Sequence, residues 1–274
     1  MKSFTSHIPL CAIAFAAVMA GTTAAYGTTN AEKCATYELR TENVAADTTL
    51  VQGMNMAALD SMLQRVHDDD QDVRRNFTVM LQSNNADSIL AYQERMEETD
   101  SRCRAIVFPI LDSVGIPDGL TEKAREALFL VVQHSDVEHQ RKYIDLFDAA
   151  AKKELVARAD VATMRDRILM HEGRPQIYGT QTFTPNRTII INSDGGKRIA
   201  DDGEDNGGET SASQPTAYLW PVESPDGLDA RRAEVGLPPM DTYIELFRQS
   251  GVSLVWDRSL TVEKIKAQRG NSEQ

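Results

Sequence analysis

The sequence has little positive charge, few cysteines and no long apolar run. Its 274 residues include 29 Lys and Arg against 41 Asp and Glu, which gives a formal net charge of −12 at pH 7. This balance argues against a general binder of nucleic acid, which needs clustered positive charge, and against electrostatic attachment to anionic lipid. No apolar run reaches the roughly 18 residues that span a bilayer, so we expect no transmembrane segment after removal of an N-terminal signal.

Several signatures of known chemistry are also missing. The sequence contains no G-x-S-x-G, no Walker loop, no G-x-G-x-x-G and no H-E-x-x-H. It has no C-x-x-C pair, which argues against a zinc site. The segment Asp202–Gly207 partly imitates a calcium loop, but the twelfth position is Ser213 in place of the bidentate Glu. The sequence therefore predicts neither a metal site nor a cofactor.

The first 25 residues have the pattern of an export signal. Lys2 precedes an apolar run over residues 8–20, and small or hydroxyl residues follow as far as Ala25. A short basic start, an apolar stretch of about 7–15 residues and a small-residue exit are typical of a secretory signal peptide. We expect cleavage near Ala25 or Gly27 and a periplasmic or secreted mature protein. A buried N-terminal helix is the alternative.

Export would determine which of the three cysteines remain and whether they can form a disulfide. Cys11 would leave with the signal, so that Cys34 and Cys103 would have one possible pairing in an oxidising compartment. A disulfide between them would close a loop of about 70 residues and stabilise the fold by roughly 4 kcal/mol in the loop-entropy model. Two unpaired, buried thiols are the alternative.

Apolar residues recur at three- and four-residue spacings through most of the chain, which predicts a predominantly helical α+β fold built on a helical bundle. Thr121 has the side chain of an N-cap, and Glu122 in the first turn suits the helix dipole. Helices are expected over 54–82, 87–114, a stretch opened by Thr121, 137–153, 161–171, 228–235 and 241–249.

β-Branched and aromatic residues gather later in the chain. The runs 177–183 and 188–191 flank the turn residues 184–186, which predicts a small antiparallel hairpin, and 217–222 is a candidate third strand. The segment 192–216 has five Gly, six acidic residues and almost no apolar residue. We expect a disordered acidic insert there, because it cannot bury enough surface to offset the entropy of ordering.

These elements are expected to form one mainly helical domain over 54–249. The residues at 26–53 would be an N-terminal extension, and those at 250–274 a C-terminal tail whose last dozen residues are polar and frayed. No shift in composition marks a boundary between two domains within 54–249.

The densest group of polar residues, Gln133–Gln140, lies where one predicted helix ends and the next begins. Asp136 or Ser135 can cap the second helix. His134 and His139 are five residues apart, which is the wrong spacing for joint metal ligation from one helix. The group either carries chemistry through His134 or satisfies the backbone of a buried helix junction.

A second polar group runs from Arg165 to Gln181. Gly173 and Gly179 permit tight turns and a close approach of the backbone. Neutral donors and acceptors come from Gln176, Tyr178, Thr180 and Gln181. Such groups can recognise a sugar, an amide or a peptide. Equally, they can pin a loop to a helix bundle.

Four stretches of this sequence carry a family resemblance. They are Asp70-Gln71 with Arg74 (D-Q-x-x-R), Gln133-His134 with Asp136 and Gln140 (Q-H-x-D…Q), Asp166-Arg167 with 172–181 (D-R…E-G-x-P-Q-x-Y-G-T-Q), and 221–243 with Arg231-Arg232 (R-R-x-x-x-G-L-P). In these stretches the chain resembles a bacterial family of domains of unknown function, found mostly in exported or lipid-anchored proteins. The resemblance implies no particular activity, but it nominates a common set of polar residues.

The leading hypothesis is a binding or interaction domain for an unknown envelope or extracellular ligand or protein. Its polar pocket would be formed by the helix junction at His134 and by the loop 173–181. The nominated binding residues are Asp70, Gln71, Arg74, Gln133, Gln140, Gln176, Tyr178, Thr180 and Gln181.

Two alternatives stay open. In a hydrolase or lyase, His134 would be the general base, Asp136 or Asp166 would orient it, and Arg167 would stabilise developing negative charge. In a purely structural domain without a small-molecule site, the same polar residues would only hold the fold together.

Overall fold

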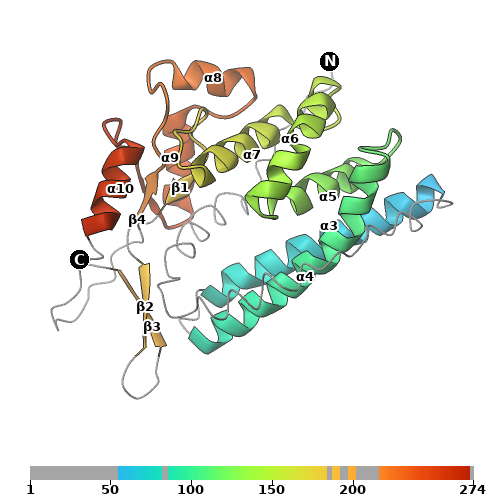
Figure 1. Ribbon diagram of the computed structural model, residues 1–274, viewed down its shortest axis with the longest axis horizontal. Helices are drawn as coiled ribbons and strands as arrows, with labels where there is room; N and C mark the ends of the chain where they lie inside the picture. The colour runs from blue at the N-terminus through green and yellow to red at the C-terminus, as the bar shows by residue number, and fades with distance from the viewer. Residues whose placement is uncertain (1–54, 82–85, 184–186, 192–196, 202–215, 272–274) are drawn as a thin grey trace. The chain divides into compact units, whose positions relative to one another are not determined.

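The computed structural model forms two compact units, which are described separately (Figure 1). We call residues 55–139 the helical unit, and residues 140–183 with 216–271 the mixed unit. The residues that the structure describes are 55–81, 86–183, 187–191, 197–201 and 216–271. The predicted signal at 1–25 and the extension at 26–53 lie outside these ranges and stay predictions.

The helical unit contains three helices. They are α3 (Met56–Leu81), α4 (Ala86–Ser113) and α5 (Glu122–Gln133). The predicted three- and four-residue apolar stripe of α3 is buried, for example at Leu63, Val66 and Phe77, and this helix packs against both α4 and α5. The Thr121 side chain accepts a hydrogen bond from the backbone of Ala124, which confirms the predicted start of α5.

The mixed unit combines helices with a three-stranded sheet. Its helices are α6 (Val137–Lys152, which starts at the boundary of the units), α7 (Arg158–His171), α8 (Leu228–Glu234), α9 (Met240–Gln249) and α10 (Val262–Asn271). Its strands are β1 (Thr182–Phe183), β4 (Thr216–Leu219) and β5 (Ser253–Val255). The order is β1-β4-β5, with β4 antiparallel to β1 and parallel to β5.

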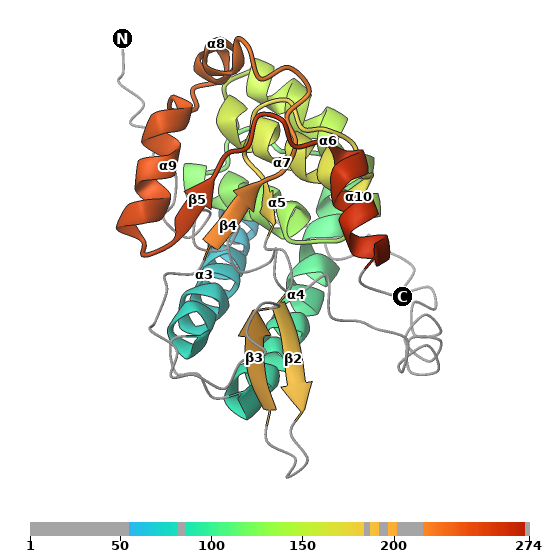
Figure 2. The same ribbon diagram turned by 90° about the vertical axis from the view of Figure 1, so that its left-hand side faces the viewer.

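Helices cover both faces of this sheet, as Figure 2 shows for α9 and α10 on either side of β4. On one face, Ala217 and Leu219 of β4 pack with Tyr243 and Phe247 of α9. The other cluster consists of Phe183, Trp220, Val262 and Ile265. Successive side chains of β4 point to opposite faces of the sheet. This short strand therefore contacts both apolar clusters.

The structure confirms the predominantly helical α+β fold but changes the pairing of the strands. The predicted hairpin paired 177–183 with 188–191, whereas β1 pairs with β4, and β2 (Arg187–Ile191) pairs with β3 (Lys197–Asp201). The hairpin prediction was wrong because Phe183 finds its aromatic partners, Tyr218 and Trp220, far along the chain.

Two further segments are more ordered than the sequence suggested. Residues 197–201 form β3 within the predicted insert 192–216, most of which lies outside the described residues. Residues 262–271, expected to be frayed, form α10, because Val262 and Ile265 place two apolar side chains on one helix face. Nowhere in the described ranges is a helix long and apolar enough for a membrane crossing.

Candidate functional site

One carboxylate holds the loop 173–181 in place. Asp166 of α7 is fully buried, and its oxygens accept hydrogen bonds from the amides of Ile177 (2.8 Å), Tyr178 (3.1 Å) and Thr180 (3.1 Å). The Thr180 hydroxyl donates a further bond over 2.9 Å. Burial raises the pKa of the Asp166 carboxyl, and these donated bonds oppose the rise. The carboxylate supplies the partners that a buried, irregular backbone lacks.

The side chain of Gln176 closes the same loop on itself. Its Oε1 accepts hydrogen bonds from the amides of Thr180 (2.9 Å) and Gln181 (2.8 Å). Its Nε2 donates to the carbonyls of Gln181 (3.0 Å) and Trp220 (2.6 Å). Both ends of this buried amide are therefore occupied by the protein's own backbone, and Gln176 acts as a structural clamp.

Arg232 and Tyr243 bind the carbonyl groups of the loop. Arg232 Nη1 donates to the carbonyls of Tyr178 (2.6 Å) and Gly179 (3.0 Å), and the Tyr243 hydroxyl donates to that of Thr180 (2.9 Å). The Arg232 guanidinium also lies 4.8 Å from the centre of the Tyr243 ring. Gly179 has φ +66°, so the turn at this point favours glycine.

Most of the predicted binding residues of this loop consequently face inward. Gln176, Thr180 and Gln181 are 0%, 4% and 3% exposed. Tyr178 is half-buried and lines the pocket that is described next. The pinning role that the sequence left open is thus the one that the hydrogen bonds of Gln176 and Thr180 support.

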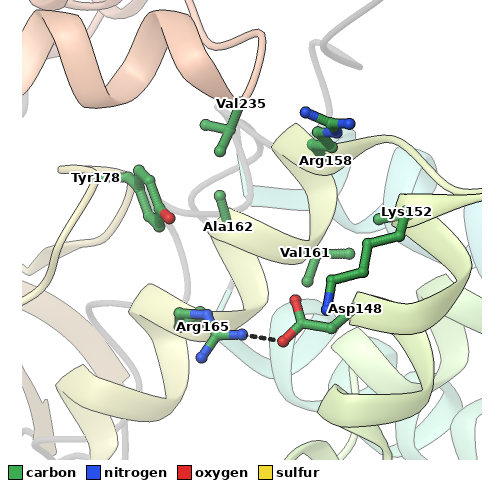
Figure 3. Close-up of a pocket in the computed structure, with 9 residues that line it drawn as sticks. Asp148, Lys152, Arg158, Val161, Ala162, Arg165, Tyr178 and Val235 are labelled. Atoms are coloured by element: carbon green, nitrogen blue, oxygen red, sulfur yellow. Dashed lines mark hydrogen bonds and ion pairs between the residues drawn. The ribbon is translucent and has the colours of Figure 1, made fainter. Parts of the chain in front are cut away.

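A pocket of about 380 Å³ opens beside Tyr178, between α6 and α7 (Figure 3). Each helix contributes residues at three- and four-residue spacings, which place them on one face. The lining residues are Asp148, Ala151 and Lys152 of α6, Arg158, Val161, Ala162 and Arg165 of α7, Tyr178 of the loop, and Val235 after α8. Figure 3 shows the hydroxyl end of Tyr178 directed toward this space.

The charged lining of the pocket is mainly basic. Arg165 forms an ion pair with Asp148, and the two side chains are 38% and 32% exposed. Lys152 and Arg158 are exposed. Burial raises the pKa of the Tyr178 hydroxyl, with a smaller opposing effect of Arg165, so that it is a protonated donor at neutral pH. The pocket can therefore offer cations and a neutral hydroxyl to a ligand.

The helical unit holds the predicted base, His134, against Asp70. His134 Nδ1 lies 2.9 Å from Asp70 Oδ1. Burial by itself would raise the pKa of Asp70, but His134 and then Arg74 outweigh it and lower this pKa to about 2. An ionised carboxylate only accepts, so Nδ1 carries the proton, and in the neutral imidazole the lone pair is on Nε2. This orientation is the one that a general base needs.

A network of charges surrounds this pair. Arg74 Nη1 lies 2.8 Å from Asp70 Oδ1, and Arg74 Nη2 lies 2.8 Å from Asp100 Oδ1. Gln71 Nε2 donates to Asp70 Oδ2 over 2.8 Å. Asp70, Gln71, Arg74 and His134 were all nominated from the sequence, and the structure brings them together. They link α3 to α4 and α5.

The remaining nominated residues have other surroundings. Asp136 caps α6 by accepting from the amide of His139 (3.0 Å) and pairs with its ring Nδ1 (2.7 Å). The carboxylate that contacts the His134 ring is that of Asp70, whereas the hypothesis named Asp136 or Asp166. Gln133 and Gln140 are buried, and Arg167 is half-buried on α7.

Cys103 is a buried thiol on α4. Burial, followed by the nearby charges of Asp70 and Asp100, raises its pKa to about 12. The thiol is protonated at neutral pH and is a poor nucleophile. Cys34 lies outside the described residues, so the Cys34–Cys103 disulfide stays a prediction. Within the described ranges, no group of three or more His, Cys, Asp or Glu is placed to hold a metal ion.

Sequence reasoning missed most of the charged pocket residues. Arg158 and Arg165 are seven residues apart, and Asp148 and Lys152 are four apart, so each pair shares a helix face. That spacing could have indicated that the charged side chains of each pair lie on one helix face. This signal was weak because charged residues at these spacings usually form a solvated helix surface.

Comparison with known proteins identifies a family and no closer relative. A family model described as "Family of unknown function (DUF6624)" matches residues 57–194, just over half of the chain. This range includes every pocket-lining residue except Val235. No curated protein and no solved structure matches the chain.

Proposed function

Because the chain belongs to the DUF6624 family, a family of unknown function, we propose that it is a binding domain whose ligand occupies the α6–α7 pocket. The observation that carries this proposal is that Tyr178, whose backbone is held by Asp166 and Arg232, lines a pocket of about 380 Å³. Small-molecule sites typically measure about 300–1,000 Å³. Because Asp166 and Gln176 already fix the loop, little conformational entropy is lost when a ligand contacts it.

The lining favours binding over group transfer. Among the described residues that line the pocket, none is Ser, Thr, Cys or His, and the carboxylate of Asp148 is engaged by Arg165. Its apolar side chains, such as Val161 and Val235, offer a surface for the body of a ligand. This combination is typical of recognition sites.

We place this ligand outside the cytoplasm, in the envelope or the medium, if the predicted signal at 1–25 directs export. The sequence hypothesis of one pocket shared by the His134 junction and the loop 173–181 stays a prediction. The present proposal needs only residues of the mixed unit.

Filling the pocket with a bulky side chain tests this proposal. In the wild-type protein, millimolar benzoate or benzamide should shift the backbone amide signals of Val161, Ala162 and Tyr178 in ¹⁵N-correlation NMR spectra. Val235→Trp places an indole at the pocket wall and should abolish these shifts. Ala233→Trp is the matched control, because Ala233 is exposed near the end of α8, two residues before Val235, and does not line the pocket. Shifts that survive Val235→Trp, or that map elsewhere, would contradict the proposal.

A second candidate, a hydrolase or lyase, is favoured by the 2.9 Å contact between His134 and Asp70. The His134 side chain is 10% exposed, so its ring is only narrowly accessible. This candidate predicts that the protein hydrolyses p-nitrophenyl acetate and that His134→Gln lowers the rate about 100-fold. His139→Gln is the control for unspecific imidazole catalysis, since His139 is more exposed and pairs with Asp136. Equal losses in both variants would exclude His134 as the base.

A further inference from the structure

The charges of the α6–α7 pocket differ from those of the whole protein. The chain carries a formal net charge of −12, yet Lys152, Arg158 and Arg165 outnumber Asp148 around this pocket. Isolated charges on a helix surface are common, but here α6, α7 and the loop 173–181 all contribute polar side chains to the same pocket. A local excess of cations in an acidic protein favours a negatively charged ligand.

The cations are spread along the pocket. Arg158 and Arg165 are seven residues apart on α7, which is about 10 Å along the helix axis. Figure 3 shows them at opposite ends of the lining, with Val161 and Ala162 between them. A ligand that contacts this surface has an apolar body and negatively charged groups at one or both of its ends.

The ion pair between Arg165 and Asp148 does not prevent Arg165 from binding an anion. A guanidinium has five N–H donors in a planar fork, so it can hold Asp148 and still donate to a second acceptor. Asp148 would repel that acceptor, and it therefore lowers the affinity for an anion. Removal of the Asp148 charge should therefore strengthen the binding of an anionic ligand and weaken the binding of a cationic one.

We propose that the ligand of this pocket is an organic dianion with an apolar body, a dicarboxylate or a phosphate monoester. Lys152, Arg158 and Arg165 bind its charged groups, the Tyr178 hydroxyl donates a hydrogen bond to it, and the apolar side chains contact its body. This inference rests on the proposed binding function and adds the charge of the ligand to it.

A series of small aromatic probes tests the charge. The dissociation constants of benzamide (neutral), benzoate (one charge), terephthalate (two carboxylates) and phenyl phosphate are measured from the NMR shifts of the Tyr178 and Ala162 amides. We expect the better of the two dianions to bind at least tenfold more tightly than benzamide, with benzoate in between. The preference for terephthalate or for phenyl phosphate then distinguishes carboxylates from phosphate esters.

Variants of the charged residues identify the groups responsible. Lys152→Gln combined with Arg158→Gln should reduce the preference for the dianion over benzamide to less than threefold. Lys153→Gln should leave it unchanged, because Lys153 follows Lys152 on the surface and does not line the pocket. Asp148→Asn should strengthen dianion binding by about three- to tenfold, since it removes a like charge at the site.

The failures of the two proposals can be told apart. If benzamide shifts the pocket amides as strongly as the dianions do, the pocket binds ligands but the inferred charge is wrong. Weaker binding of the dianions to the Asp148→Asn variant would likewise contradict the proposal that the ligand is negatively charged. If none of the probes shifts the pocket amides, both the charge and the binding function of this pocket are rejected.

Discussion

Asp166→Asn is expected to lower the free energy of unfolding by about 3–5 kcal/mol. The carboxylate accepts hydrogen bonds from three backbone amides and from the Thr180 hydroxyl. An asparagine keeps one acceptor oxygen and turns an NH₂ group toward the remaining donors, which stay buried without a partner. The substitution changes almost no volume, so that the loss measures hydrogen bonding and not packing.

Urea denaturation followed by circular dichroism measures this loss. Asp145→Asn is the control, because Asp145 lies on the exposed surface of α6, and its change should stay within about 0.5 kcal/mol. If Asp166→Asn costs less than about 1 kcal/mol, the loop 173–181 is not held by this carboxylate. The same variant should also lose benzoate binding, since Tyr178 is positioned through its amide.

Arg74→Gln is expected to cost about 3–5 kcal/mol, because it leaves Asp70 and Asp100 with less compensating charge. Both carboxylates are buried or nearly so, and burial already raises the pKa of Asp100. Glutamine keeps part of the side-chain length but not the positive charge. Arg75→Gln is the matched control, since Arg75 is the next residue and its ion pair with Asp72 is exposed.

The same substitution should change the response to acid. The pKa of Asp70 is about 2 in the folded protein against an ordinary value of 3.8. Its contribution to stability is therefore complete above pH 3.8 and is lost as the pH falls toward 2. Without Arg74 the folded-state pKa rises, so that the acid-unfolding midpoint moves to higher pH. A midpoint equal to that of Arg75→Gln would show that Arg74 does not stabilise the charged form of Asp70.

The sequence was sufficient to predict the described helices of this fold apart from α10. Regular apolar spacing marks α3, and Thr121 marks the start of α5, because both signals act within a few residues. Strand pairing depends on distant partners, such as Thr182 with Leu219, which no local pattern reveals. This is why the predicted hairpin was wrong, although the segments that form β1, β2 and β4 were recognised.

The polar residues of the candidate site were found more easily than their roles. Gln176 was nominated to bind a ligand and Asp166 to orient a general base, yet their side chains bind the backbone of the loop. Composition cannot distinguish a polar side chain that faces a ligand from one that replaces a missing backbone partner. The partner of His134 was also hidden, because Asp70 lies 64 residues earlier in the chain.

A crystal structure of the protein soaked with terephthalate is the most direct test of the pocket as a ligand site. We expect the aromatic ring to lie beside Tyr178, with carboxylate oxygens within hydrogen-bond distance of Lys152, Arg158 or Arg165. An empty α6–α7 pocket at a saturating concentration, or terephthalate bound at another surface alone, would contradict the proposal.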